Sequence, residues 1–219
     1  MIVLIGGEKG GTGKTTIATN LAQLRAKNGF DVLLIDTDKQ ASSTFWASTR
    51  EENKLEPFIS SVQKQGKTIT KDIVELAKRY DDVIIDAGGR DNVELRASLL
   101  ACHIVIIPVQ ASQFDLWSLS TFDDLLEETK IFNQNLQAFC VINRSSPNPS
   151  VNESNEAKEL FTELKNISFS EIILKDRIAY RKAVAEGQGI TELKPIDPKA
   201  KEEIEALYYF VFNTKNIPD

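Results

Sequence analysis

A glycine- and lysine-rich segment near the start of the chain has the residue types needed to bind phosphate. Residues 8–16 read EKGGTGKTT and lie between an apolar run and a segment with helical periodicity. Glycines let successive backbone N–H groups turn toward phosphate oxygens, and the N-terminus of the following helix adds a favourable dipole. The chemistry indicated is binding of a nucleoside triphosphate through its phosphates, in a P-loop.

The polar side chains of this segment have separate expected roles. Lys14 is expected to reach the β and γ phosphates, the Thr15 hydroxyl to ligate Mg²⁺, and Thr16 to contact the α phosphate. The remaining nucleotide-binding residues predicted in the loop are Gly10, Gly11, Thr12 and Gly13. The alternative is a glycine-rich turn that merely begins a helix. It does not explain why Gly-Lys-Thr stands in register between a strand and a helix.

Two further apolar runs end in carboxylates. Asp36 and Asp38 follow residues 32–35, and Asp86 follows residues 83–85. Carboxylates at positions i and i+2 leave a strand on the same side, so they can share the water shell of a magnesium ion and the attacking water. Asp86 is expected to bind Mg²⁺ through a water molecule.

These groups must be positioned by regular elements. Apolar runs predict strands at 2–5, 32–35, 83–85, 104–109 and 138–143, and further strands are expected at 58–62 and 169–174. Helices are expected at 13–28, 41–50, 71–79, 93–101, 116–132, 156–164 and 198–212, with a loop over 145–152. Gly29 is expected to end the first helix, Thr70 to cap the third, and Asp197 to cap the last.

Strands that alternate with helices predict an α/β fold with a mostly parallel twisted sheet flanked by helices on both faces. Ligands bind at the carboxyl ends of the strands in such sheets. The three motifs follow Ile5, Ile35 and Ile85, at just those ends. A length of 219 residues suits one domain, predicted to be a single P-loop ATPase domain over 1–219.

Composition narrows the classes of function. The net charge of −6 argues against wholesale binding to nucleic acid, so any DNA contact needs a local basic patch. The single histidine, His103, leaves little material for a His-based triad or a multi-His metal site. Cys102 and Cys140 lie far apart in or beside apolar runs and are expected to be reduced core thiols. The N-terminus suggests neither a signal peptide nor a membrane span.

The loop departs from the general G-x-x-x-x-G-K-[ST] pattern, because Glu8 occupies the first glycine position and Lys9 precedes the glycine pair. The pattern Lys-Gly-Gly-x-Gly-Lys-Thr-Thr resembles the deviant Walker A group of partition and septum-positioning ATPases related to ParA and MinD. This resemblance implies that Lys9 crosses an ATP-sandwiched dimer to the partner's nucleotide. It also implies that Asp36 supports Mg²⁺ through water and that Asp38 orients the nucleophilic water.

Phosphoryl transfer needs positioning and charge stabilisation more than a strong base, so Asp38 with Lys9 and Lys14 suffices as a catalytic set. The usual family continuation after the second carboxylate is Pro-Gln, whereas this chain has Lys39-Gln40, which leaves the local loop shape open. Residues 87–91 form a segment able to sense the γ phosphate and move. Within it, Arg90 could contact the partner subunit or be solvated.

Asn143 and Arg144 end another predicted strand. They are similar to the family's Asn-Arg or Asn-Lys element, in which the asparagine hydrogen-bonds adenine, and the resemblance implies nucleotide contacts here. An asparagine amide offers both a donor and an acceptor to a base edge, which suits adenine over guanine. The alternative is a turn asparagine that follows a strand. Residues 174–180 are similar to a late family segment near the nucleotide and the dimer edge.

The resemblance implies an ATP-dependent positioning ATPase that forms a homodimer, binds nucleoid DNA non-specifically and hydrolyses ATP when a partner stimulates it. The cofactors are then ATP and Mg²⁺, and the location is cytoplasmic and nucleoid-associated. The partner would be an adaptor or centromere-binding protein, and the cargo a plasmid, a chromosomal locus or an assembly such as a carboxysome. The DNA-binding candidates are Lys175, Arg177, Arg181 and Lys182. A solvated helix is the alternative for this cluster, in which Arg177 and Arg181 share a face if it is helical.

Two other classes of function remain to be weighed. Membrane positioning, as in the septum-site relatives, would use a basic amphipathic tail, but the aromatic run 207–212 favours core packing and no membrane partner is expected. A metabolic P-loop enzyme could be a carboxylate ligase or a nitrogenase-type reductase. A reductase needs cysteines that bridge a cluster between subunits, and Cys102 and Cys140 do not follow the motif-bearing strands. A ligase is not excluded.

Overall fold

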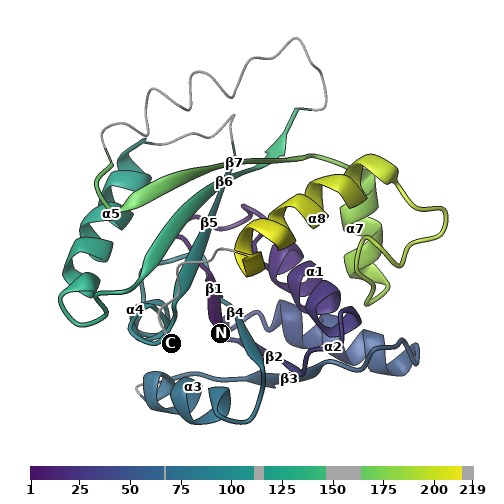
Figure 1. Ribbon diagram of the computed structural model, residues 1–219, viewed down its shortest axis with the longest axis horizontal. Coiled ribbons are helices and arrows are strands. Elements are labelled where there is room, and N and C mark those ends of the chain that lie inside the picture. Colours follow the sequence, from purple (N-terminus) through teal and green to yellow (C-terminus); the bar gives the residue numbers. More distant parts are fainter. Residues whose placement is uncertain (67, 111–115, 147–163, 214–219) are drawn as a thin grey trace.

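A sheet of seven parallel strands forms the centre of the computed structural model, which describes residues 1–66, 68–110, 116–146 and 164–213 (Figure 1). The strand order is β3-β2-β4-β1-β5-β6-β7. The strands are β1 (Ile2–Ile5), β2 (Val32–Asp36), β3 (Ser60–Gln63), β4 (Asp82–Asp86), β5 (Ile104–Gln110), β6 (Gln137–Ser145) and β7 (Ile167–Lys175). The predicted parallel sheet is confirmed.

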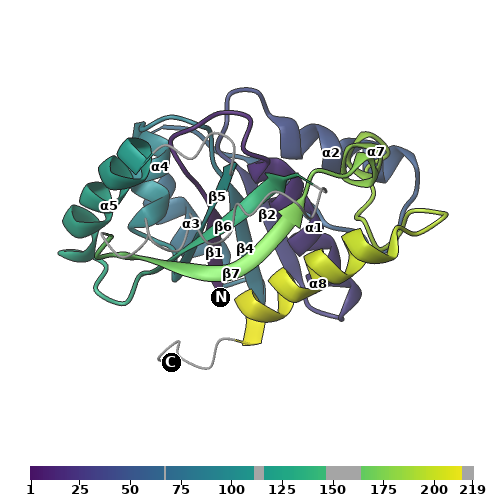
Figure 2. The same ribbon diagram turned by 90° about the horizontal axis from the view of Figure 1, so that it is seen from above.

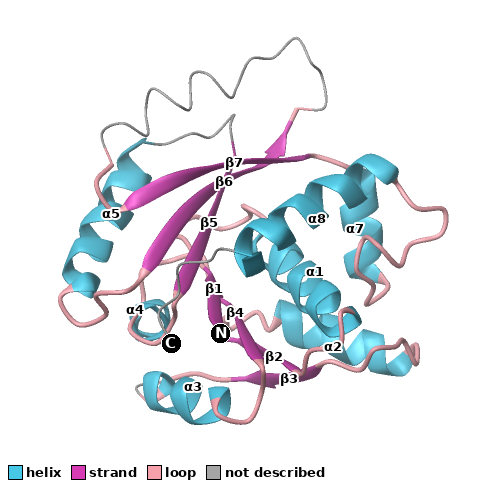
Figure 3. Ribbon diagram, viewed as in Figure 1, coloured by secondary structure: helices cyan, strands magenta, loops and turns pink. Residues whose placement is uncertain are grey.

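Helices cover both faces of this sheet, as predicted (Figures 2 and 3). They are α1 (Lys14–Lys27), α2 (Ser42–Glu52), α3 (Ile69–Ala77), α4 (Val93–Leu99), α5 (Leu116–Lys130), α7 (Ile178–Ala185) and α8 (Pro198–Asn213). α3, α4 and α5 lie on one face, where Ile73, Leu95 and Phe122 join Leu4 and Ile85 in one core cluster. The other helices cover the opposite face.

Alternation along the strands divides the core into two clusters. In β1, Leu4 belongs to the cluster under α3, α4 and α5, whereas Val3 and Ile5 pack with Ile17 of α1 and Leu207 of α8. Because both faces of the sheet are covered, a strand needs apolar residues at every position. This explains why the strands read as unbroken apolar runs in the sequence.

α1 is the helix that the P-loop leads into, and it is packed on most sides. Ile17, Leu21 and Leu24 are buried, at the spacing predicted for its core-facing stripe. Gly29 follows the helix with φ of +88°, a conformation that glycine adopts without the cost imposed by a Cβ atom. The predicted helix end is therefore confirmed.

Some predicted local details were wrong. Thr70 lies inside α3 rather than at its cap, and its hydroxyl donates to the carbonyl of Ala97 at 2.9 Å. The strand expected from Phe58 begins at Ser60, and Ser145 belongs to β6 rather than to a loop. The rest of the expected loop 145–152 beyond residue 146, and the helix 156–164 apart from its last residue, lie outside the described residues.

The aromatic run near the C-terminus packs mainly into the core, as the sequence indicated. Leu207, Tyr208 and Val211 of α8 are buried, and the ring of Phe210 meets that of Phe139 edge to face at 4.9 Å between centroids. Tyr209 is exposed. Within the described ranges, no helix combines the length and the apolar character that crossing a bilayer requires.

A buried guanidinium fixes the far end of α2. Arg50 is 2% exposed and pairs with both carboxylate oxygens of Glu192 at 2.8 and 2.9 Å. It also donates to the carbonyls of Pro57 and Gly187 at 3.0 and 3.1 Å. Charge and carbonyl contacts together satisfy this cation away from water, so α2 is tied to the segment between α7 and α8.

We expect Arg50→Ala to lower the free energy of unfolding by about 3 kcal/mol, because it leaves Glu192 without its partner in a mostly buried position. Urea denaturation followed by circular dichroism measures the loss. The control is Lys78→Ala, which removes the ion pair between Lys78, 63% exposed, and Glu75. It should change stability by about 0.5 kcal/mol or less. Equal losses in the two variants would contradict the buried network.

Candidate functional site

The P-loop joins β1 to α1 at the carboxyl edge of the sheet. Gly13 precedes α1 with φ of +92°, and Lys14 begins the helix with only 7% of its surface exposed. The Lys14 ammonium donates to the Lys9 carbonyl at 2.6 Å, across the mouth of the loop. Burial lowers the pKa of Lys14, and the carboxylates of Asp86 and Asp38 oppose that shift. A buried cation thus faces two carboxylates at the loop.

Thr15 and Asp86 meet as the sequence predicted. The Thr15 hydroxyl donates to Oδ2 of Asp86 at 2.7 Å, although the two residues are 71 positions apart. Burial raises the pKa of Asp86 to about 7 together with the nearby Asp36 carboxylate, while the Thr15 hydrogen bond and the Lys14 charge oppose the rise. A buried carboxylate with so little compensation is costly unless a cation approaches it.

The same residues fit a magnesium ion. Oδ1 of Asp86 is buried and has no hydrogen-bond partner among the described residues. Mg²⁺ prefers hard oxygen ligands and is usually held by one or two carboxylates together with substrate phosphates and water. The Thr15 hydroxyl and the Asp86 carboxylate supply oxygens of this kind beside the P-loop, so these two residues would hold the ion.

Asp36 is fully buried and already has several hydrogen-bond donors. Its Oδ2 accepts from the backbone N–H groups of Ser43 and Thr44, both at 3.0 Å, and its Oδ1 accepts from the N–H of Asp38 at 3.0 Å. The carboxylate therefore stabilises the first turn of α2. Its predicted support of Mg²⁺ through water stays a prediction. No local pattern in the sequence predicts this capping contact, because it depends on how the loop after β2 folds back.

Asp38 lies at the meeting point of the two predicted switch segments. Its Oδ1 accepts from the N–H of Gln40 at 3.0 Å, which orders the turn after β2. A Cβ atom on Gly88 would lie 3.4 Å from the Asp38 carboxylate, and one on Gly89 would lie 2.6 Å from the backbone nitrogen of Gly10. The backbone of the segment after β4 thus packs directly on the P-loop, with the Asp38 carboxylate beside it. Arg90 of this segment is exposed.

Two side-chain amides contact the P-loop from the next strands. Asn143, 6% exposed, donates through Nδ2 to the Thr12 carbonyl at 2.6 Å. Gln110 donates through Nε2 to the Gly11 carbonyl at 2.9 Å. The amide nitrogen of Asn143 is thus directed to the loop, and its implied contact with adenine stays a prediction. Gln110 was missed because only its place at a strand end signals a role.

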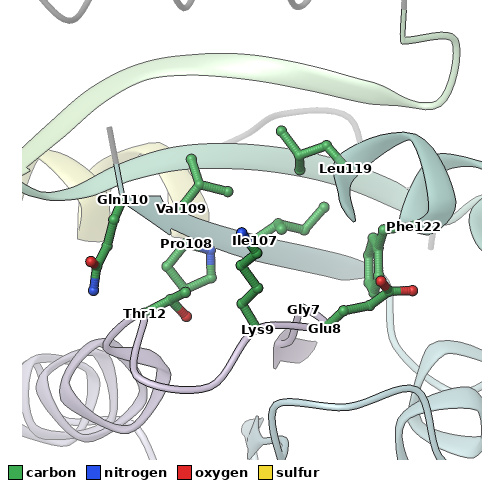
Figure 4. A pocket seen from close by; sticks show the side chains of 10 residues that line it. All are labelled: Gly7, Glu8, Lys9, Thr12, Ile107, Pro108, Val109, Gln110, Leu119 and Phe122. Carbon is green, nitrogen blue, oxygen red and sulfur yellow. The ribbon is translucent and has the colours of Figure 1, made fainter. Parts of the chain in front are cut away.

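Lys9 and Glu8 line a cavity beside the P-loop whose other walls come from β5 and α5 (Figure 4). The Lys9 side chain extends toward β5 of its own chain, and Glu8 points toward Phe122 (Figure 4). Burial and the Asp91 carboxylate raise the pKa of Glu8, and Arg96 opposes the shift. The implied reach of Lys9 into a partner subunit is untested in this single chain.

A second cavity brings together other predicted residues. It is lined by Thr16, Asn143, Arg144, Lys175, Asp176, Arg177, Tyr180 and Arg181. Arg144 takes the left-handed backbone conformation, with φ of +55°, where β6 is about to end. The nucleotide candidates at the start of α1 and the end of β6 therefore lie next to the segment 175–181.

The predicted DNA-binding residues form a basic cluster, of which two members are bonded within the chain and two are mainly exposed. The four residues are Lys175, Arg177, Arg181 and Lys182. Arg177 precedes α7, rather than sharing a helical face with Arg181, and pairs with Glu203 of α8 at 2.6 Å. Lys175 donates to the carbonyl of Ser146 at 3.1 Å. Arg181 is 65% exposed, with its guanidinium 3.9 Å from the exposed carboxylate of Asp176, and Lys182 is exposed as well. Only the last two are turned to solvent.

A phosphate loop at the carboxyl edge of a parallel sheet, with a lysine, a hydroxyl and a carboxylate beside it, defines a P-loop nucleotide-binding protein. The profile of the CobQ/CobB/MinD/ParA nucleotide binding domain matches residues 3–190. The chain belongs to this family, which confirms the resemblance drawn from the P-loop and the switch carboxylates.

Individual relatives agree with this assignment. The chain is 27% identical over 203 residues to the maintenance of carboxysome distribution protein A from Halothiobacillus neapolitanus, which covers 91% of this chain and 90% of that protein. Among solved structures, apo McdA from Cyanothece superposes with a TM-score of 0.74 at 19% identity, over 96% of this chain and 98% of that one. The septum site-determining protein MinD complexed with Mg-ADP from Pyrococcus horikoshii gives 0.73 at 17%, over 98% and 97%. Both structures share the fold.

We expect Asp86→Asn to remove most of the gain in ATP affinity that Mg²⁺ provides, a loss of about tenfold or more, because the neutral amide attracts the cation and its water less. Isothermal titration with ATP in Mg²⁺ and in a chelator measures the gain for each variant. Asp72→Asn, on α3 and away from the loop, is the control. An undiminished gain in Asp86→Asn would show that this carboxylate does not serve the metal.

Proposed function

We propose that this protein is a single-domain ATPase, over residues 1–219, that binds ATP with Mg²⁺ and hydrolyses it to ADP and phosphate as part of a positioning or partition system. The convergence of Lys14, Thr15, Asp86 and Asp38 at one edge of the sheet supports this proposal most directly. Each of these groups is the type that phosphoryl transfer uses, and they come from three separate segments of the chain.

The proposed reaction is an in-line displacement. Water attacks the γ phosphorus, the bond from that phosphorus to the bridging oxygen breaks, and ADP, phosphate and a proton leave. Lys14 stabilises negative charge on the phosphates, the loop N–H groups bind them, and Asp38 orients the water. Thr15 and Asp86 would hold magnesium, which would neutralise charge on the phosphate oxygens.

The proposal includes an ATP-dependent homodimer in which Lys9 reaches the partner's nucleotide. Gly88 and Gly89 lie against Asp38 and the P-loop, so a γ phosphate bound in the loop would contact the segment after β4. Loss of that phosphate would change the contacts of this segment. Hydrolysis of the nucleotide would then alter the protein surface that the segment forms.

The work of the ATPase is proposed to be the distribution of a cargo over nucleoid DNA in the cytoplasm. The ATP-bound dimer would bind DNA non-specifically, and an adaptor or a centromere-binding protein would stimulate hydrolysis. The relative from Halothiobacillus neapolitanus, whose name refers to carboxysome distribution, supports a protein assembly as cargo. A plasmid or chromosomal locus is the other cargo to test.

The competing functions have less support. A reductase that shares an iron–sulfur cluster between subunits would need exposed cysteines, whereas Cys102 and Cys140 are 1% and 0% exposed. Their burial raises the pKa of both thiols, which disfavours the thiolate that binds such a cluster. A membrane-positioning role would need an exposed amphipathic surface, but Leu207 and Val211 of α8 are turned into the core.

We expect Asp38→Ala to bind ATP with nearly unchanged affinity and to hydrolyse it about a hundredfold more slowly, because water is no longer oriented. The variant should accumulate as a dimer with ATP, seen by size-exclusion chromatography with light scattering. Asp124→Ala, an exposed carboxylate of α5, should behave as the unaltered protein. Normal turnover in Asp38→Ala would show that another group positions the water.

We expect the double reversal Arg181→Glu and Lys182→Glu to weaken binding of the ATP-bound protein to random-sequence DNA. The slope of log affinity against log salt should fall in magnitude by about 2, because two phosphate contacts are lost. Arg177 is left intact because it is bonded to Glu203.

The control for the DNA experiment is Lys71→Glu with Lys78→Glu, which makes the same change in net charge on α3, across the sheet from α7. Fluorescence anisotropy with a labelled duplex at several salt concentrations measures both pairs. If the two pairs of substitutions change DNA affinity equally, or not at all, then Arg181 and Lys182 are merely solvated and do not bind DNA through this surface.

A further inference from the structure

The loop that would hold the triphosphate is itself held by two neutral amides. Gln110 ends β5 and Asn143 lies opposite it in β6, as direct partners in the parallel register. From these adjacent positions, Gln110 donates to the Gly11 carbonyl at 2.9 Å and Asn143 to the Thr12 carbonyl at 2.6 Å. Figure 4 shows the Gln110 side chain descending from the end of β5 toward the loop. Two neighbouring strands thus contact two consecutive peptide groups.

Fixing a carbonyl also fixes the N–H group of the same peptide unit. In a planar trans peptide the C=O and N–H bonds point in opposite directions. When the carbonyls of Gly11 and Thr12 are drawn toward the strand ends, the N–H groups of Thr12 and Gly13 are directed the other way. Backbone N–H groups turned together to one side form an anion-binding concavity. The amides therefore favour the loop conformation that binds phosphate.

The contact at Asn143 depends on the absence of a side chain at Gly13. A Cβ atom on Gly13 would collide with Nδ2 of Asn143, and the φ of +92° at Gly13 suits glycine alone at low cost. Asn143 is buried, so its donor is not readily replaced by water. A carboxylate in its place would set an oxygen against the carbonyl oxygen. Glycine at 13 and an amide at 143 therefore depend on each other.

We propose that Gln110 and Asn143 form an amide clamp whose function is to pre-organise the P-loop for the triphosphate. The clamp residues are positioning residues, since they act on phosphate through the loop backbone. This inference rests on the proposed binding of ATP in the P-loop. It predicts that loss of either clamp amide weakens the binding of inorganic tripolyphosphate, which has no base, as well as that of ATP and GTP.

The test uses the full chain with four single substitutions: Gln110→Ala, Gln110→Glu, Asn143→Ala and Asn143→Asp. Each alanine variant should bind all three ligands about three- to tenfold more weakly, the effect of one hydrogen bond. The carboxylate variants should lose more, because an acceptor then faces the loop carbonyl. Isothermal titration in Mg²⁺ gives the affinities, and the ratio of ATP to GTP affinity should stay constant in the Gln110 variants.

Asn53→Ala is the matched control. Its amide also donates to a backbone carbonyl, that of Glu186 at 3.1 Å, but at the end of α2 away from the loop. It should leave all three affinities unchanged. Thermal unfolding without ligand separates a folding defect from a loop defect, and Gln110→Glu, at a partly exposed position, decides the question if the Asn143 variants fail to fold.

The possible outcomes are distinct. A loss confined to ATP in the Asn143 variants, with tripolyphosphate unaffected, would overturn the clamp and assign Asn143 to reading the base. Unchanged affinities in folded variants would overturn it as well. If the unaltered protein binds none of the three ligands, the proposed ATPase function fails, whereas binding of ATP and of tripolyphosphate that the clamp variants weaken supports both conclusions.

Discussion

Hydrogen bonding between parallel strands decides which residues of neighbouring strands end at the same level, and the candidate site depends on that register. Asp86 of β4 lies opposite both Ile5 of β1 and Asp36 of β2. Since β1 leads directly into the P-loop, this alignment carries the buried carboxylate to the Thr15 hydroxyl. A slip of one residue would turn Asp86 to the other face of the sheet and replace it with an apolar side chain.

The contacts around α2 extend this constraint to the opposite side of the molecule. Asp36 accepts hydrogen bonds in the first turn of α2, and Arg50, one turn from its end, holds the segment that contains Gly187 and Glu192. With both ends of the helix fixed, the short turn that carries Asp38 lies between two anchored elements. That keeps the Asp38 carboxylate over Gly88, where the second switch segment passes. The carboxylate proposed to position the water and the packing of α2 are therefore parts of one network.

The sequence predicts those parts of this network that follow from local chemistry. Glycines with a lysine and threonines predict the P-loop, and carboxylates at strand ends predict that Asp86 meets Thr15, because a parallel sheet gathers such ends. Contacts between segments distant in the chain are not predictable in this way. Arg177 reads as a free cation until α8 brings Glu203 to it, and Gln110 reads as an ordinary strand end until the loop carbonyls are placed.

The P-loop is contacted on two sides, by strands on one side and by a connecting segment on the other, and these contacts differ in how easily they can be lost. Gln110 and Asn143 belong to strands, so their hydrogen bonds to the loop persist as long as the sheet does. Gly89 belongs to a connection and touches Gly10 through backbone alone, with no side chain to hold it there. In the proposed function, a phosphate bound beside Gly10 would therefore displace the segment after β4 rather than distort the loop. This asymmetry would let a small change in the nucleotide move one segment while the binding surface keeps its shape.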